Sequence, residues 1–248
     1  MYYPDLETVR QLAKKGNYIP VYGEVLADME TPVSAFSKIA YDNKGNKSPY
    51  AFLLESVEGG DNIGRFSFLG CDPIYTFKQN GDTAKIFHNE EHIETISGSS
   101  AFTNMQKFLK RFVQVPIDGL APFSGGAVGY ASFETIEQIE PKVQCRKEDG
   151  LDVPDAIFLI TDSLIAFDRV KHTMQIISHV DLTGEDSVEE AYAKACDKIK
   201  GILNKLQKPV AIPLLRSLIK DEALPCRSNL TKEEFTEMVL KAKKYIVD

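Results

Sequence analysis

Two histidines four positions apart could bind a metal ion. The run HNEEH at 88–92 matches the H-x-x-E-H pattern, in which two imidazoles project from one face of a helix and hold zinc. Here the flanking runs 83–87 and 92–96 are typical of paired strands, so residues 89–91 are expected to form the turn between them. The sequence therefore predicts a solvated hairpin tip at these histidines and no metal site.

Three glycines in the run SGGAVGY at 124–130 could suggest a phosphate-binding loop. The run has neither the G-x-G-x-x-G spacing nor the Lys and Ser/Thr pair of a Walker loop. Glycines inside a strand mark a bulge or the close approach of another backbone. We therefore expect these glycines to have a structural role.

A third candidate site lies at the end of an apolar strand. Residues 49–56, PYAFLLES, are apolar on both faces until Glu55 and Ser56, which predicts a central strand with a polar end. A serine hydroxyl at such an end can bind the ammonium or carboxylate group of an amino acid whose side chain enters the apolar layer. An ordinary strand end is the alternative that the residue types leave open.

The remaining histidines and the cysteines suggest no further site. His172 and His179 lie far in sequence from any cluster of cysteine or acidic residues, so they indicate neither a ligand set nor a catalytic triad. The four cysteines are widely scattered and are expected to be reduced thiols: Cys71, Cys145, Cys196 and Cys226.

Periodicity and turn signals predict the elements that position these residues. Helices are expected to start at the N-caps Asp5, Thr31, Ser100, Ser187 and Thr231, and the first helix is expected to stop at Gly16. Strands are expected at 19–26, 50–57, 65–71, 74–78, 83–87, 92–96, 124–132, 156–167 and 173–180, with a hairpin joining the last two. Residues 207–228 contain three prolines and are expected to form a loop. Since no regular βαβ alternation is present, the sequence predicts an α+β fold, a mainly antiparallel sheet with flanking helices.

The composition narrows the class of protein. The 248 residues are 43% hydrophobic and 26% charged, as is typical of a globular chain, and the net charge of −7 argues against a nucleic-acid partner. No apolar run approaches the ~20 residues of a membrane span, and the N-terminus does not look like a signal peptide. We therefore expect a cytoplasmic protein without membrane contact. The last helix has no terminating residue, which suggests that the chain is the N-terminal piece of a longer protein.

Five blocks carry a resemblance to a known family. The run 49–56, ending in LLES, resembles the feedback-site motif of anthranilate synthase component I, and the blocks at 19–36, 62–70, 123–130 and 167–172 (FDRVKH) follow in that family's order. The likeness covers essentially the whole chain. It implies that residues 1–228 are the N-terminal regulatory region and that residues 229–248 begin the chorismate-binding catalytic region. The implied fold is roughly half of the family's sandwich of two large antiparallel sheets.

The resemblance also implies the activity of the parent enzyme. That enzyme converts chorismate and ammonia into anthranilate and pyruvate with the help of Mg²⁺, and a glutamine amidotransferase subunit supplies the ammonia. The family's chorismate and magnesium ligands lie in the other half of its sequence. We therefore assign no catalytic residue and no metal ligand here, and we expect this chain to be inactive alone.

Tryptophan, the end product of the pathway, is implied as a feedback inhibitor that binds near Leu54, Glu55 and Ser56. Ser56 is expected to contact the ligand's amino group, and Glu55 is expected to contribute mainly through its backbone. Arg65 and Phe66 are weaker candidates, because a segment whose length varies across the family separates them from the motif. Two alternatives remain: the related aminodeoxychorismate synthase component, which holds tryptophan as a structural ligand, and a stand-alone amino-acid-binding module.

Overall fold

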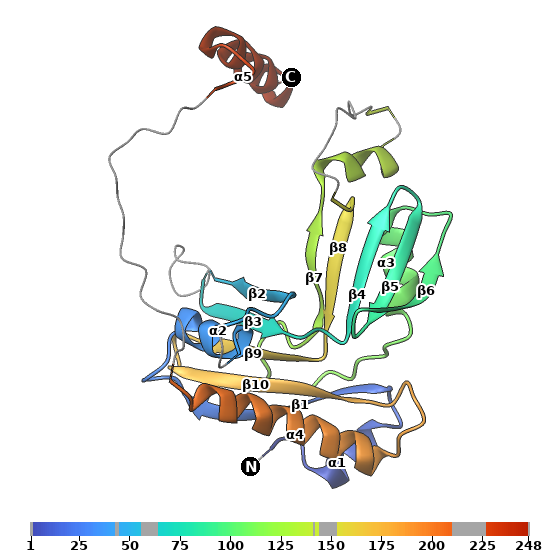
Figure 1. Ribbon diagram of the computed structural model, residues 1–248, viewed down its shortest axis with the longest axis vertical. Helices are drawn as coiled ribbons and strands as arrows, with labels where there is room; N and C mark the ends of the chain where they lie inside the picture. Colours follow the sequence, from blue (N-terminus) through green and yellow to red (C-terminus); the bar gives the residue numbers. More distant parts are fainter. Residues whose placement is uncertain are drawn as a thin grey trace. The chain divides into compact units, whose positions relative to one another are not determined.

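The computed structural model describes residues 2–42, 45–55, 64–140, 142–143, 153–209 and 227–247. The chain divides into two units, Met1–Ile212 and Pro213–Asp248. The described residues of the first unit form two five-stranded antiparallel sheets with flanking helices (Figure 1). The predicted α+β class with antiparallel sheets is therefore confirmed.

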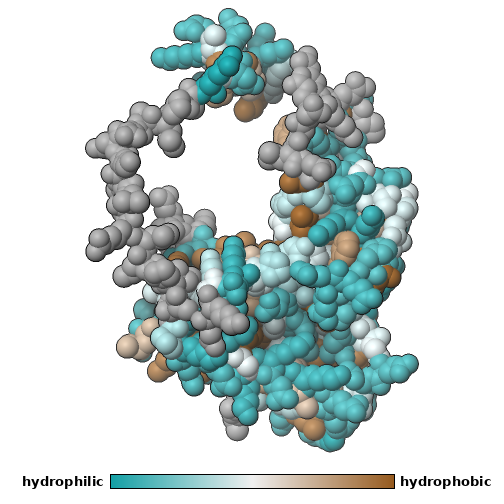
Figure 2. Space-filling model, in the orientation of Figure 1, coloured by the Kyte–Doolittle hydropathy of each residue, from teal (hydrophilic) through white to brown (hydrophobic). Residues whose placement is uncertain are grey.

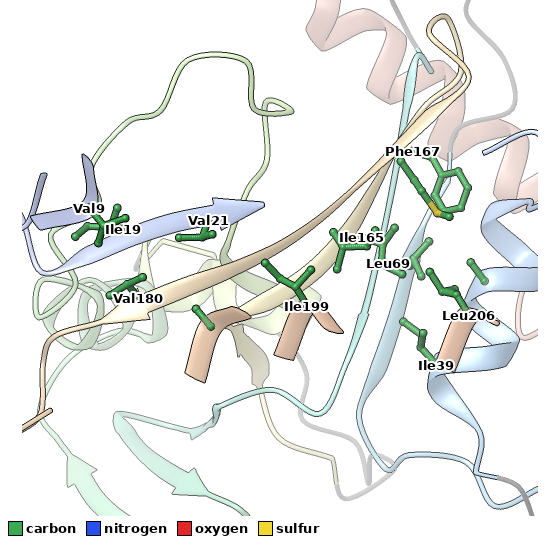
Figure 3. Packing of buried hydrophobic residues seen from close by; sticks show 14 of the residues in the cluster. Val9, Ile19, Val21, Ile39, Leu69, Ile165, Phe167, Val180, Ile199 and Leu206 are labelled. Atoms are coloured by element: carbon green, nitrogen blue, oxygen red, sulfur yellow. The ribbon is translucent and has the colours of Figure 1, made fainter. Parts of the chain in front are cut away.

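The first sheet has the strand order β1-β10-β9-β3-β2. Its strands are β1 (Tyr18–Leu26), β10 (Thr173–Asp181), β9 (Ser163–Asp168), β3 (Phe66–Cys71) and β2 (Ala51–Leu54). Helices α1 (Leu6–Leu12), α2 (Pro32–Ala40) and α4 (Val188–Leu206) pack on one of its faces. Figure 3 shows how Val9 of α1, Ile39 of α2 and Ile199 of α4 meet the side chains of the strands in one apolar core.

Successive side chains of a strand point to opposite faces, and here both faces of the central strands are buried. On β9, Ile165 and Phe167 enter the core under the helices, whereas Leu164 and Ala166 belong to a separate cluster on the opposite face. This explains why the central strands read as nearly continuous apolar runs in the sequence.

The second sheet has the strand order β6-β5-β4-β8-β7. Its strands are β6 (Glu91–Ile96), β5 (Thr83–His88), β4 (Tyr75–Asn80), β8 (Ala156–Thr161) and β7 (Gly126–Ala131). Helix α3 (Ala101–Leu109) packs on it through Met105 and Phe108, and a short 3-10 helix, η1 (Phe133–Gln138), follows β7. In Figure 1 the strands of this sheet stand crosswise to those of the first sheet.

The predicted single strand at 156–167 is wrong. The run is two strands, β8 and β9, which belong to different sheets and are separated by Asp162. Both halves are apolar, because β9 is covered on both faces and β8 lies inside its sheet. Hydrophobic pattern alone therefore contains no signal for the step between sheets. The predicted hairpin from β9 to β10 is confirmed.

The predicted position of strand β2 is also wrong. Among the described residues it lies at the edge of the first sheet, paired only with β3. Its side chains are half-buried or exposed, which agrees with an edge position. Two apolar faces predict a central strand, but an edge strand between two apolar layers gives the same pattern.

Most of the predicted helix starts are confirmed by their caps. Asp5, Thr31, Ser100 and Ser187 each accept a backbone hydrogen bond in the first turn of α1, α2, α3 and α4. Gly16, however, does not end the first helix in a left-handed conformation, because the C-cap is Ala13. Gly16 instead allows close packing: a Cβ atom there would lie 2.3 Å from the carbonyl oxygen of Val113.

The expected role of the glycines at 124–130 is confirmed by Gly129. A Cβ atom at this position would lie 1.9 Å from the carbonyl oxygen of Ile157 in β8, so the two backbones approach too closely for any side chain. The hairpin predicted at the two histidines is confirmed as well, with β5 and β6 joined through a turn at Asn89 and Glu90.

The described part of the second unit is helix α5 (Lys232–Val247) with residues 227–231 before it. Thr231 and Glu234 form the predicted reciprocal cap at its start. All described side chains of this helix are exposed, including Phe235 and Ile246. Most of the loop predicted at 207–228 lies outside the described residues.

The surface of the first unit is mostly polar. Figure 2 shows hydrophilic residues over most of the visible face, with separate hydrophobic side chains among them. Among the described helices, none combines the length and the apolar character needed to cross a bilayer.

Candidate functional site

The candidate site is centred on the C-terminal end of β2, where the strand places neighbouring side chains on opposite faces. Leu53 belongs to the core under the helices, whereas Phe52 belongs to the cluster on the other face. By the same alternation Leu54 shares the face of Phe52, and it is 46% exposed. Leu54 pairs with Phe68 on β3, so the end of the motif lies beside an aromatic residue. Ser56 lies outside the described residues.

A half-buried aromatic surface adjoins Leu54. We call it the aromatic surface, and it consists of Phe52, Phe66, Phe68 and Phe123. The rings of Phe66 and Phe68 stack with centroids 6.0 Å apart, and the ring of Phe123 meets Phe68 edge-on at 5.5 Å. An apolar aromatic layer with a polar strand end beside it suits a ligand that has an aromatic body and a charged head group.

The side chain of Glu55 points to the other face of the sheet, where it meets Arg169. Nη2 of Arg169 lies 2.7 Å from Oε1 of Glu55, and the same nitrogen lies 3.3 Å from the hydroxyl oxygen of Ser67. Both partners of the ion pair are partly exposed, with side-chain exposures of 37% and 24%. The carboxylate of Glu55 is therefore held by another side chain of the protein.

Arg65 forms a bidentate ion pair with Asp168. Nε donates to Oδ1 at 3.0 Å and Nη2 donates to Oδ2 at 2.6 Å. The Arg65 guanidinium is the largest cause of the lowered pKa of the Asp168 carboxyl, and hydrogen bonds from the backbone N–H groups of Lys171 and Val170 lower it further. The guanidinium carbon of Arg65 also lies 4.9 Å from the centre of the Phe66 ring. Arg65 and Phe66, predicted as weaker site residues, are thus in contact with each other.

Sequence reasoning did not assign a role to Asp168 and Arg169. They lie in the run FDRVKH at 167–172, which served only as one block of the family resemblance. The structure brings them from β9 and the following turn to the ends of β2 and β3. The signal that could have found them is the pair of opposite charges in a tight turn after an apolar strand.

Two cavities lie near the ends of β3. A small one of about 240 Å³ borders Arg65, Phe66, Asp168 and Lys171, so it adjoins the candidate site. A larger one of about 440 Å³ lies at the opposite end of β3, between Cys71, Asp162 and Lys198. The larger cavity is therefore separate from the predicted tryptophan-binding residues.

The described residues do not provide a site for Mg²⁺. Within the described ranges, no three histidine, cysteine, aspartate or glutamate side chains come close enough to hold a metal ion. At the candidate site the two carboxylates are bound to arginines instead. The described cysteines, Cys71 and Cys196, are free thiols, and burial is the main cause that raises the pKa of Cys71 to about 12.

Comparison with known proteins gives the family. Residues 49–248 match the family model described as chorismate binding enzyme, so the chain belongs to the family of chorismate-binding enzymes. It is 38% identical to anthranilate synthase component 1 of Synechocystis over 98% of the chain and 48% of that protein. It is 37% identical to a probable anthranilate synthase component 1 of Schizosaccharomyces pombe, over 98% of the chain and 46% of that protein. The chain therefore spans about half the length of the curated relatives it matches.

A solved structure supports the fold. Anthranilate synthase component I from Streptococcus pneumoniae aligns with 89% of this chain and 44% of its own, with a TM-score of 0.50 and 22% identity. At this identity the likeness concerns the fold alone. The resemblance inferred from the sequence motifs is thus confirmed for the family and for the fold.

Proposed function

We propose that this chain is part of an anthranilate synthase component I. Residues 1–228 form its tryptophan-binding regulatory region, and residues 229–248 begin its catalytic region. The observation that carries the proposal is the end of β2, where Leu54 adjoins the aromatic surface on one face and Glu55 meets Arg169 on the other. The family match and the names of the similar proteins support the same assignment.

In this proposal the complete enzyme makes anthranilate and pyruvate from chorismate, with ammonia from a glutamine amidotransferase subunit, in the cytoplasm. Mg²⁺ would stabilise developing negative charge in that reaction. The resemblance places the family's chorismate and magnesium ligands in the other half of its sequence, so we assign no catalytic step to the described residues. On the same ground the chain alone is expected to be inactive.

Tryptophan would act on this enzyme as a negative effector. Its indole ring would pack on the aromatic surface beside Leu54, and the family resemblance assigns its amino group to the Ser56 hydroxyl and the backbone at Glu55. Phe66 contributes to the apolar side of the site, and Arg65 holds one border of it through Asp168. Inhibition then requires that tryptophan bind a less active state of the enzyme more tightly than the active one.

Tryptophan binding can be tested by fluorescence, because the chain has no tryptophan of its own. The chain contains no tryptophan, and its 10 tyrosines absorb little at the red edge, so added L-tryptophan is almost the only fluorophore excited there. We would titrate a trace of L-tryptophan with the protein and follow emission wavelength and anisotropy. A blue shift with rising anisotropy is expected, and the variant Ser56→Phe should abolish both.

The matched control is Ser97→Phe, which places the same ring at an exposed serine after β6 and should leave binding unchanged. If neither this chain nor a version extended to the relatives' full length changes the fluorescence, the proposal is wrong. Assay of the extended enzyme for anthranilate against 4-amino-4-deoxychorismate distinguishes it from the related aminodeoxychorismate synthase component.

A further inference from the structure

The end of β9 and the turn after it contact one residue on each side of the segment 56–63, Glu55 and Arg65. The turn begins at Arg169, directly after Asp168, the last residue of β9. Arg169 reaches Glu55, which precedes the segment, and Asp168 reaches Arg65, which follows it closely.

The contact with Arg65 and the contact with Glu55 are made by different groups. The Arg65 and Asp168 pair has two parallel hydrogen bonds, the geometry that makes arginine and carboxylate pairs directional as well as strong. The backbone N–H of Arg169 also donates to the carbonyl oxygen of Arg65 at 3.0 Å. The start of β3 is therefore fixed to the turn by both main chain and side chain, whereas the end of β2 is fixed by the side chain of Arg169.

The turn itself is held in one conformation. Oδ1 of Asp168 accepts hydrogen bonds from the backbone N–H groups of Val170 at 3.0 Å and Lys171 at 3.2 Å. The side chain of Asp168 is only 10% exposed, so this carboxylate is shielded from competing water. A turn braced in this way can act as a rigid support for the chain ends that it contacts.

We propose that Asp168 and Arg169 are positioning residues that hold Glu55 and Arg65 in the arrangement that binds tryptophan. The inference rests on the proposed function, because it concerns how the same site is held. Its physical basis is preorganisation: a binding site whose borders are already fixed loses less conformational entropy when the ligand binds. Arg169 does this through a side chain that the ligand does not need to contact.

The test measures tryptophan affinity in variants of the Arg169 and Glu55 pair. We expect Arg169→Ala to raise the Kd of the fluorescence titration by about 2- to 5-fold, the range of a half-exposed ion pair. Arg169→Lys keeps the charge and should restore most of the affinity. The exchange variant Glu55→Arg with Arg169→Glu should bind better than either single variant, because it rebuilds the pair with the charges reversed.

A matched control comes from the second sheet. Arg111 forms a bidentate ion pair with Glu94, and their side chains are 49% and 31% exposed. This pair does not contact the candidate site. Arg111→Ala should leave the Kd unchanged even if it lowers the melting temperature as much as Arg169→Ala does. In the extended enzyme, Arg169→Ala should raise the tryptophan concentration needed for half-inhibition, whereas Arg111→Ala should leave it unchanged, a contrast that a merely structural effect would not produce.

The outcomes separate the two proposals. If the wild-type chain and the extended enzyme bind no tryptophan, the proposed function fails and this inference fails with it. If wild type binds and Arg169→Ala binds equally well, only the positioning role is refuted. The positioning role is also refuted if Arg111→Ala weakens binding as much as Arg169→Ala, or if the exchange variant is no better than the single ones.

Discussion

The buried imidazole of His179 predicts how the stability of this fold depends on pH. His179 lies in β10 and is 3% exposed, with the ring of Tyr18 stacked on it at 4.2 Å. Its Nδ1 lies 3.0 Å from the carbonyl oxygen of Asp162 and must carry the proton that it donates, while Nε2 has no partner among the described residues. Burial is the largest influence and lowers the pKa of His179. The folded protein therefore holds this ring neutral.

The sign of the effect follows from the groups around the ring. The carbonyl and carboxylate of Asp162 and the carboxylate of Asp181 favour the protonated form, whereas Lys198 opposes it, and burial outweighs the favourable terms. Because the folded pKa lies below the unfolded value of 6.5, the unfolded chain binds more protons as the pH falls. The contribution of His179 to stability is thus complete above pH 6.5 and decreases below it, by at most about 1.4 kcal/mol per pH unit, until the folded pKa is reached.

The variant His179→Phe isolates this contribution. It keeps a flat ring against Tyr18 but loses the hydrogen bond to Asp162, so at pH 7 it should be less stable than wild type by about 1 kcal/mol. Since phenylalanine does not titrate, the difference in unfolding free energy between wild type and His179→Phe should shrink as the pH falls below 6.5. Urea unfolding at half-unit steps from pH 7.5 to about pH 5 measures it. A difference between wild type and His179→Phe that stays constant over this pH range would refute the reasoning.

Three further predictions concern packing and caps, and each is checked by the free energy of urea unfolding. Gly129→Ala should destabilise the fold by about 3 kcal/mol or more, because the new Cβ atom would meet the backbone oxygen of Ile157. Its matched control Gly201→Ala has no atom within 4 Å of the new Cβ and lies in α4, so it should stabilise by up to about 1 kcal/mol; equal effects would refute the close approach of β7 and β8. Ser187→Ala should cost about 1 kcal/mol by removing the cap of α4. Leu69→Ala should cost about 2–5 kcal/mol, because the side chain is fully buried, and a smaller loss would mean that the core closes around the gap.

Local signals in the sequence located most of the elements, because caps and tight turns are decided by a few neighbouring residues. Thr31 and Ser187 cap their helices as their residue types predict, and the turn at 89–90 separates two strands as expected. The change of sheet at Asp162 could not be predicted, because it depends on residues that are distant in sequence. The strand before Asp162 pairs with β4 and the strand after it pairs with β3, and both partners lie some eighty residues or more earlier in the chain.

The same limit applies to the candidate site. The family resemblance predicts the site residues Leu54, Glu55, Ser56, Arg65 and Phe66, but it gives no reason for Glu55 to carry a charge. The structure supplies one, because Arg169 lies 114 positions away in sequence and 2.7 Å away in space. A site at the end of an edge strand depends on such a distant partner: among the described residues β2 is paired on one side only, so main-chain hydrogen bonds alone hold its end loosely. If the proposed function holds, we expect the side chains that set tryptophan affinity to include residues that never touch tryptophan, and these are the residues that a linear motif does not contain.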